Sequence, residues 1–277
     1  MAAAIDYEAE YNNPARVPEH PPIIAGWARD SEAYRASHGR WRALRYGGGE
    51  RHVMDFFPSE ADAGAIVMFI HGGYWQKLDR SFFSYAARGL NLRGVSVAVP
   101  SYDLCPAVTV GDIIGQMRRA ARELARLGRP LVVSGHSAGG HLAACLLATD
   151  WPGMSAELPA DLVTAAYAIS GVFDLEPLIP TSMNTALQLD AATARAVSPL
   201  FWPAPHRGVL DAVVGGAESS EFLRQSQVMV EAWGKAGFAA RYEALPGANH
   251  FTVVAPLADP DSAMTGRLAE LAGLGRR

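Results

Sequence analysis

The pentapeptide G-H-S-A-G at residues 135–139 constrains the fold of this chain more than any other stretch. An apolar run at 131–134 precedes it, and an Ala- and Leu-rich run from Gly140 follows it. G-x-S-x-G between a strand and a helix is typical of a nucleophile elbow, a sharp turn that lifts a serine hydroxyl clear of the sheet. The glycines are needed because side chains two residues from the strained serine would collide with the neighbouring strand and helix. The pattern therefore predicts Ser137 as a nucleophile.

The rest of the chain alternates between strand-like and helix-like segments. Residues 65–70 are continuously apolar, which indicates a strand covered by helices on both faces. Residues 110–127 are amphipathic, with an apolar stripe at helical spacing. This alternation predicts an α/β fold with a mostly parallel sheet and helices on both faces. The predicted strands are 65–70, 95–99, 131–134, 163–169, 209–214 and 240–245, and the predicted helices are 80–92, 110–127, 220–235 and 261–274.

We interpret the 277 residues as a single domain with two additions. Residues 1–40 are predicted to form an extended N-terminal arm followed by one short helix at 23–35, packed near the mouth of the site. Two short runs at 40–46 and 51–57, joined through three glycines, indicate a hairpin. The proline-rich segment 172–207 interrupts the alternation and predicts a cap over the strand ends, where such sheets bind ligands.

Composition excludes several classes of protein. The formal net charge is −4 and there is no basic run, so neither nucleic acid nor a membrane surface is an expected partner. The N-terminus turns acidic before any apolar signal region forms, and no apolar run of 18 residues occurs. The two cysteines, Cys105 and Cys145, lack metal or redox spacing and indicate free thiols in the cytoplasm. We expect a small-molecule substrate and neither a cofactor nor a metal. The sequence leaves open whether the protein forms a homodimer.

A nucleophilic serine needs a base, and in this fold the chain order is serine, acid, histidine. His250 follows the last predicted strand in a loop and is the one histidine in the right place. His141 lies in the helix after the elbow, which directs it away from the hydroxyl. His206 precedes the strand that should precede the acid. The order therefore predicts His250 as the base.

The acid that orients the base should lie in the loop after the penultimate strand. Glu218 lies in that loop and is favoured. Glu221 falls in the first turn of the next helix, where a carboxylate satisfies free backbone N–H groups. Asp174, after the preceding strand, is a third candidate, because some members of this fold place the acid there. Asp211 lies inside a strand and should point into the core or the helix layer.

The motif H-G-G-Y-W at residues 71–75 follows the first buried strand directly. Backbone N–H groups at glycine can point at a developing alkoxide without obstruction, so Gly72 and Gly73 are predicted to form an oxyanion hole. The second donor should be the N–H of Ala138. We expect His71 to order this loop rather than to touch substrate.

Five segments together resemble the serine-hydrolase type kynurenine formamidases (arylformamidases), near the hormone-sensitive-lipase-like esterases. That family commonly carries an aspartate in a D-S-P-E-F context; here Glu218 replaces it and Ser220 stands in place of the proline. Glutamate can do the same orienting work. The resemblance spans residues 60–255 and implies the α/β-hydrolase fold. The segments are H-G-G-Y-W at 71–75, S-Y-D-L-C-P at 101–106, G-H-S-A-G-G-H-L at 135–142, E-S-S-E-F at 218–222 and N-H-F at 249–251.

The resemblance implies hydrolysis of an N-formylated aromatic amine such as N-formylkynurenine by a Ser-His-Glu triad. A carboxylesterase acting on aryl or short-chain acyl esters is the alternative, because the same groups cleave such esters. A non-catalytic hydrolase-fold receptor is the third reading, and the intact triad argues against it. Aromatic side chains near the motifs are predicted to form the substrate pocket, and these are Tyr74, Trp75, Phe201, Trp202 and Phe251.

Overall fold

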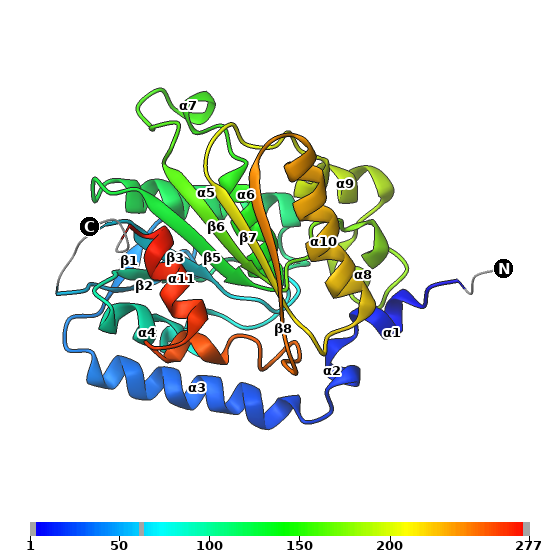
Figure 1. Ribbon diagram of the computed structural model, residues 1–277, viewed down its shortest axis with the longest axis horizontal. Helices are drawn as coiled ribbons and strands as arrows, with labels where there is room; N and C mark the ends of the chain where they lie inside the picture. The colour runs from blue at the N-terminus through cyan, green and yellow to red at the C-terminus, as the bar shows by residue number, and fades with distance from the viewer. Residues whose placement is uncertain (1–3, 61–63, 274–277) are drawn as a thin grey trace.

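The computed structural model describes residues 4–60 and 64–273, which are built around an eight-stranded sheet (Figure 1). The strand order is β1-β2-β4-β3-β5-β6-β7-β8. β1 pairs with β2, and β2 with β4, in antiparallel fashion, and all the other pairs are parallel. This arrangement confirms the predicted mostly parallel α/β fold. The strands are β1 Arg42–Arg45, β2 Val53–Phe57, β3 Ile66–Ile70, β4 Val97–Pro100, β5 Leu131–His136, β6 Val163–Ile169, β7 Val209–Gly215 and β8 Ala239–Leu245.

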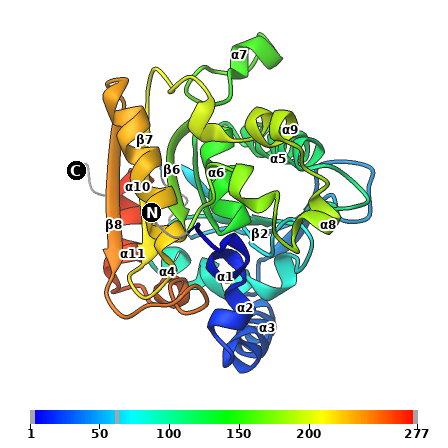
Figure 2. The ribbon, with the colours of Figure 1, turned by 90° about the vertical axis from the view of Figure 1, so that its right-hand side faces the viewer.

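Helices cover both faces of the sheet (Figures 1 and 2). One apolar layer packs α5, α6 and α10 against the strands, and the other packs α3, α4 and α11. The central strands β3 and β5 are buried at every position, as expected for strands covered on both faces. The helices of these two layers are α3 His20–Ser37, α4 Ala87–Leu92, α5 Val110–Ala125, α6 Ala138–Leu147, α10 Ser220–Lys235 and α11 Ala263–Leu271.

The N-terminal segment differs from the predicted extended arm and short helix. Two short helices, α1 (Tyr7–Tyr11) and α2 (Asn13–Arg16), occupy the arm, and α3 has 18 residues. The side chains of Asp6 and Asn12 cap α1 and α2. Prolines stand in the first turns of α2 and α3, where proline is tolerated because those N–H groups have no helical partner. Prolines thus stand where α2 and α3 begin, in a segment that was predicted to be extended up to residue 23.

Shorter elements complete the chain. Residues 80–92, predicted as one helix, are two 3₁₀ turns followed by α4. Segment 172–207 lies between β6 and β7 and holds four short helical turns. Within the described part of the chain, no helix is long and apolar enough to cross a membrane. The short elements are α7 Trp151–Met154, α8 Asn184–Leu187, α9 Ala191–Ala196, η1 Arg80–Phe82, η2 Ser84–Ala86, η3 Glu176–Leu178, η4 Pro199–Phe201 and η5 Ala255–Ala258.

Candidate active site

Ser137 occupies the turn between β5 and α6. Its backbone lies in the positive-φ half of the Ramachandran plot, with φ 57° and ψ −117°, which is strained for a residue with a side chain. A Cβ atom at Gly135 would lie closer than 3.0 Å to the carbonyl of Gly139, and one at Gly139 equally close to the carbonyl of Ile70. Only hydrogen fits at these two positions, so the predicted steric reason for the glycines is confirmed.

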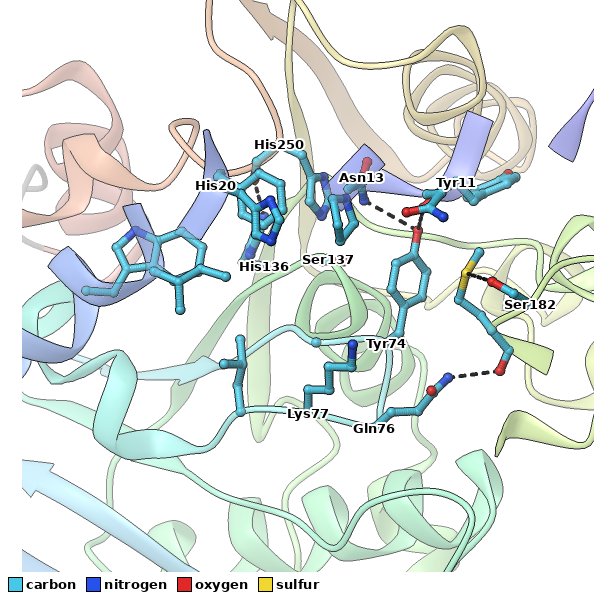
Figure 3. Close-up of a pocket in the computed structure, with 18 residues that line it drawn as sticks. Tyr11, Asn13, His20, Tyr74, Gln76, Lys77, His136, Ser137, Ser182 and His250 are labelled. Atoms are coloured by element: carbon cyan, nitrogen blue, oxygen red, sulfur yellow. Dashed lines mark hydrogen bonds between the residues drawn. The ribbon is translucent and has the colours of Figure 1, made fainter. Parts of the chain in front are cut away.

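His250 and Glu218 form a close pair beside the elbow. The Nδ1 atom of His250 lies 2.6 Å from Oε2 of Glu218, and both side chains are almost completely buried. A carboxylate can only accept, so the ring proton sits on Nδ1 and leaves Nε2 as the basic nitrogen. Ser137 and His250 line the same cavity (Figure 3). The arrangement contains the three groups of a serine-hydrolase triad, which are a serine, a histidine and an acid that orients the histidine.

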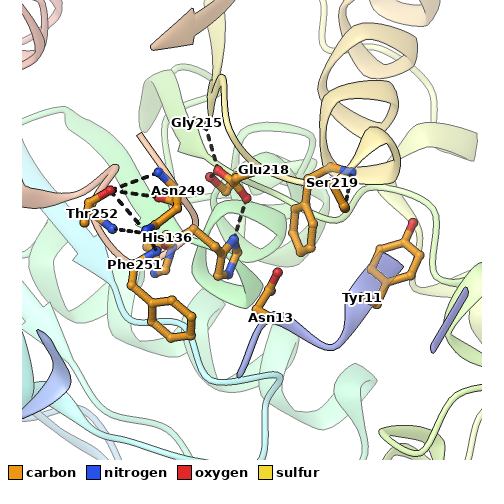
Figure 4. Close-up of polar contacts among 12 residues, drawn as sticks. Tyr11, Asn13, His136, Gly215, Glu218, Ser219, Asn249, Phe251 and Thr252 are labelled. Carbon is orange, nitrogen blue, oxygen red and sulfur yellow. Dashed lines mark hydrogen bonds and ion pairs between the residues drawn. The ribbon is translucent and has the colours of Figure 1, made fainter. Parts of the chain in front are cut away.

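The carboxylate of Glu218 is held at its other oxygen as well. Oε1 accepts the backbone N–H of Gly215 at 2.7 Å (Figure 4). It also accepts the hydroxyl of Ser170. Ser170 follows β6 directly, and Gly215 ends β7, so two neighbouring strands fix one carboxylate. Hydrogen bonds to both oxygens keep it oriented toward the imidazole.

The other acidic candidates are occupied elsewhere. Glu221 pairs with Arg224 at 2.7 Å and accepts from the Tyr11 hydroxyl at 2.9 Å; its bonds to Arg224 and Tyr11 lower the pKa of its carboxyl despite partial burial. Asp174 accepts the N–H of Glu176, two residues on. Asp211 is fully buried in β7, where arginines from β8 and α11 pair with it. Of the four acids, Glu218 is the one in contact with His250.

Three further histidines lie close to the elbow, and burial keeps each of them neutral. Burial lowers the pKa of His71 and of His141 to about 4, and it lowers that of His136 well below the ordinary value. His71 stacks on Tyr102 with ring centroids 4.2 Å apart, and Nε2 of His141 lies 2.7 Å from the carbonyl of Val197. Across the described ranges, no group of three or more His, Cys, Asp or Glu side chains is placed to hold a metal ion.

The loop after β3 lies against the nucleophile. A Cβ at Gly72 would lie 3.1 Å from the Cβ of Ser137, so the backbone of this loop approaches the serine closely. Gly73 has φ 110°, a conformation that side chains rarely adopt. Ala138 is the first residue of α6, and its N–H has no acceptor within its own helix. The three predicted oxyanion positions thus lie around the serine, with backbone donors available.

A cavity of about 450 Å³ opens in front of Ser137 (Figure 3). Its walls come from five parts of the chain: the N-terminal helices, the loop after β3, the elbow, the segment after η3 and the loop after β8. The lining residues are Tyr11, Asn12, Asn13, Pro14, His20, Ile24 and Trp27; Gly73, Tyr74, Gln76, Lys77 and Leu78; His136 and Ser137; Ser182 and Met183; and His250 and Phe251.

Two of the five predicted pocket aromatics, Tyr74 and Phe251, line the cavity, and three do not. Trp75 is fully buried and meets the ring of His141 edge-on. Phe201 is 37% exposed under the guanidinium of Arg195. Trp202 donates its indole N–H to the carbonyl of Ala196. The expectation for Trp75, Phe201 and Trp202 is therefore corrected.

The N-terminal segment lies at the mouth of the site, as predicted, but the sequence did not reveal which of its residues form a wall of the cavity. Seven lining residues come from the first 27 positions. The Tyr74 hydroxyl donates to the carbonyl of Tyr11 at 2.6 Å, and Glu8 accepts from the N–H and hydroxyl of Ser182. These contacts join the arm to the loop after β3 and to the cap. The only signal for them is the cluster of Tyr and Asn at residues 7–13, which has no assignable partner without the fold.

The fold and the site define a hydrolase of the α/β-hydrolase class. A kynurenine formamidase of Drosophila melanogaster is 31% identical over 235 residues, which cover 79% of this chain and 77% of the relative. One from Salmo salar is 30% identical over 241 residues, covering 82% and 80% respectively. The chain belongs to the kynurenine formamidase family. No family model matches the sequence.

Solved structures agree with this fold. A crystal structure from Silicibacter sp. TM1040, provisionally described as a thioesterase, superposes with a TM-score of 0.87 at 36% identity, over 95% of this chain and 98% of the other. An esterase of Pyrobaculum calidifontis superposes with a TM-score of 0.73 at 17% identity, over 94% of each chain. The second likeness is one of fold alone.

Proposed function

We propose that this protein hydrolyses the formamide of an N-formylated aromatic amine of the N-formylkynurenine type. Membership of the kynurenine formamidase family supports this substrate class. The buried His250–Glu218 pair beside the strained Ser137 supports this type of reaction, because it supplies the groups that acyl transfer to water needs.

In the proposed reaction, the hydroxyl of Ser137 attacks the formyl carbon while His250 takes its proton through Nε2. Glu218 fixes the imidazole tautomer and stabilises the imidazolium that forms. Backbone N–H groups of Gly72, Gly73 and Ala138 stabilise the oxyanion. His250 then returns the proton to the leaving aniline, and a water molecule attacks the formyl ester by the same route in reverse.

The cavity suits a compact aromatic substrate. Its volume of about 450 Å³ is near the lower end of the range of roughly 300–1,000 Å³ that is usual for small-molecule sites. Trp27, Tyr74 and Phe251 present ring surface to it, and Trp27 and Phe251 also contact each other at 6.1 Å between centroids. Aromatic walls stabilise a bound ring through area burial and offset or edge contacts.

Cleavage of esters or thioesters is the second candidate function. The structural likeness at 36% identity to a protein described as a thioesterase favours it, as does the fact that the same triad cleaves activated esters. We further propose a cytoplasmic location, in keeping with the two cysteines, which are buried as free thiols.

The comparison of kcat/KM for N-formylkynurenine, 4-nitrophenyl acetate and 4-nitrophenyl butyrate separates these functions, once corrected for leaving-group reactivity. A formamidase should prefer the formyl substrate, since each added methylene in a tight acyl pocket costs about 1–3 kcal/mol. A preference for butyrate with no measurable deformylation would make the protein an esterase on the same scaffold.

A further inference from the structure

Among the described residues that line the cavity, Lys77 is the one lysine or arginine, and none is an aspartate or glutamate. The sequence contains only two lysines, Lys77 and Lys235, against a total of 24 basic residues. Histidines aside, the formal charge of the lining is therefore the single positive charge of Lys77. A cavity with walls of low polarity and one sign of charge favours a ligand of the opposite sign.

The ammonium of Lys77 has no ion pair or hydrogen bond within the described ranges of the chain. The nearby acids are already engaged. Glu8 accepts from Ser182 and Asn12, and the resulting hydrogen bonds lower the pKa of its carboxyl. Asp79 accepts the backbone N–H of Ser81 at 2.7 Å. The three donor hydrogens of the ammonium are thus available to a ligand.

The other polar side chains of the same wall are committed to the protein. The amide of Gln76 donates to the carbonyl of Met183 at 3.0 Å, and the amide of Asn13 lies 3.4 Å from the Tyr74 hydroxyl. These bonds hold the wall in place and use one N–H of each amide, and the donors that remain on them are uncharged. Lys77 is left as the charged donor for this part of the cavity.

Lys77 is also fixed relative to the reacting atoms. Its backbone N–H donates to the carbonyl of Gly73 at 3.0 Å, and its own carbonyl packs against the α-carbon of Gly73. The loop that carries the predicted oxyanion donor thus carries the ammonium four residues further on. In Figure 3 the Lys77 side chain extends from this loop into the cavity, toward the side on which Ser137 and Tyr74 lie.

We infer that Lys77 binds a carboxylate on the leaving group of the substrate, so that the enzyme selects aromatic formamides that carry a carboxylate on the side chain. This inference rests on the proposed function. Lys77 is exposed as a residue, so its attraction to a carboxylate is partly screened by solvent and weakens with salt. A charge-assisted hydrogen bond in such a place changes kcat/KM by about 10-fold to 30-fold.

A matched pair of substrates isolates the carboxylate. N-formylkynurenine carries an α-carboxylate and an α-ammonium group, and its α-carboxamide keeps the ammonium and the ortho-acyl formanilide but loses the carboxylate charge. For the wild-type protein and Lys77→Met, the ratio of the two kcat/KM values is measured at low and high salt. The ratio should fall about 10-fold to 30-fold in Lys77→Met, mainly through KM of N-formylkynurenine, and Lys77→Arg should restore part of it. Lys235→Met is the control, because Lys235 pairs with Glu231 on the surface of α10.

An unchanged ratio in Lys77→Met, or an equal loss on both substrates, would overturn the inference. A second measurement keeps the anion site testable if the wild-type protein cleaves neither formamide, in which case the proposed function fails. Kynurenine and its α-carboxamide are then compared as inhibitors of 4-nitrophenyl acetate hydrolysis. Weaker inhibition by kynurenine alone in Lys77→Met supports the site, and equal inhibition in both proteins rejects it.

Discussion

His136 donates a hydrogen bond from Nε2 to the backbone carbonyl of His250, with the two atoms 2.8 Å apart. The pKa of His136 lies well below the ordinary value because the ring is buried and His250 is close, so the ring is neutral. A carbonyl only accepts, which places the proton on Nε2. The residue that precedes the nucleophile in the chain therefore fixes the backbone of the loop that carries the base.

Removing this bond should reduce turnover more than substrate binding. In His136→Phe the ring volume stays but the donor is lost, so we expect kcat to fall at least 10-fold while KM changes less than about 3-fold. His136→Gln, which keeps an N–H donor, should recover part of kcat. Steady-state kinetics across pH check this, since a displaced His250 also alters the pH profile of kcat/KM. Equal kcat in His136→Phe and wild type would contradict the positioning role.

Replacement of the nucleophile gives the simplest prediction. Ser137→Ala should lose nearly all turnover, by a factor of about 10⁴ or more, and keep its folding transition, because only the oxyanion donors and substrate binding remain. A fluorophosphonate should label Ser137 in the wild-type protein and nothing in the variant. Peptide mapping of the labelled protein is the measurement. Label on any other residue would contradict the proposed mechanism.

The three acids should respond differently to amide replacement. Glu218→Gln should lower kcat more than 100-fold, because the amide cannot accept in the same way from Nδ1 of His250 and favours the wrong tautomer. Glu221→Gln should act mainly on stability, since it breaks the pair with Arg224 under the buried Tyr11 hydroxyl. Asp174→Asn should change kcat by less than about 3-fold. A loss of turnover in Asp174→Asn as large as in Glu218→Gln would reassign the acid.

As the pH is lowered, this protein should begin to lose stability at a higher pH than protonation of its carboxylates alone would cause. His71 and His141 have a pKa of about 4 in the folded protein, and that of His136 is also lowered. In the unfolded chain each ring takes up a proton near pH 6.5. The stability that neutral burial provides is therefore complete above about pH 6.5 and is lost as the pH falls toward 4. Near pH 5, unfolding should take up about three protons.

Urea unfolding followed from pH 7.5 to 4.5 measures that proton uptake. The slope of the unfolding free energy against pH should decrease in His141→Gln by an amount that corresponds to about one proton near pH 5, because one buried neutral histidine is removed. His206→Gln serves as the control, since His206 is exposed in the loop before β7. A slope in His141→Gln equal to that of the wild-type protein would contradict the assignment.

The sequence predicted the elements whose periodicity and turn chemistry are local. Strand β6 and helix α10 have the predicted bounds. A largely apolar run and a serine-capped amphipathic run can each be recognised from the local sequence alone, without knowledge of the segments that they contact. Glu218 could be preferred to Glu221 for the same kind of reason. The loop residue is free to reach another segment, whereas the first-turn residue is drawn to its own helix.

The cavity walls could not be predicted in this way. Trp75 and Tyr74 are neighbours in sequence, yet one is core and the other lines the cavity, because both residues adopt positive φ. The N-terminal wall depends on contacts across more than 60 residues of sequence, such as that between Tyr11 and Tyr74. Local pattern carries no information on such pairings, and this is why Lys77 received no role until the fold placed it.

The bond between the Tyr74 hydroxyl and the carbonyl of Tyr11 should control how closely the N-terminal wall fits the site. Tyr74→Phe removes this bond and the contact with Asn13, while the ring that lines the cavity stays. We expect KM to rise about 3-fold to 10-fold with little change in kcat, because the loss of one or two neutral hydrogen bonds costs about 1 kcal/mol. Limited proteolysis should also cut faster between α1 and α3.

Tyr242→Phe is the matched control for this change. Tyr242 lies on β8, away from the cavity, and its hydroxyl has no hydrogen bond within the described residues. The control should leave KM and the rate of cleavage between α1 and α3 at wild-type values. If Tyr74→Phe shows the wild-type cleavage rate and the wild-type KM, other ties, such as those of Glu8 to Ser182 and of Tyr11 to Glu221, hold the wall without it.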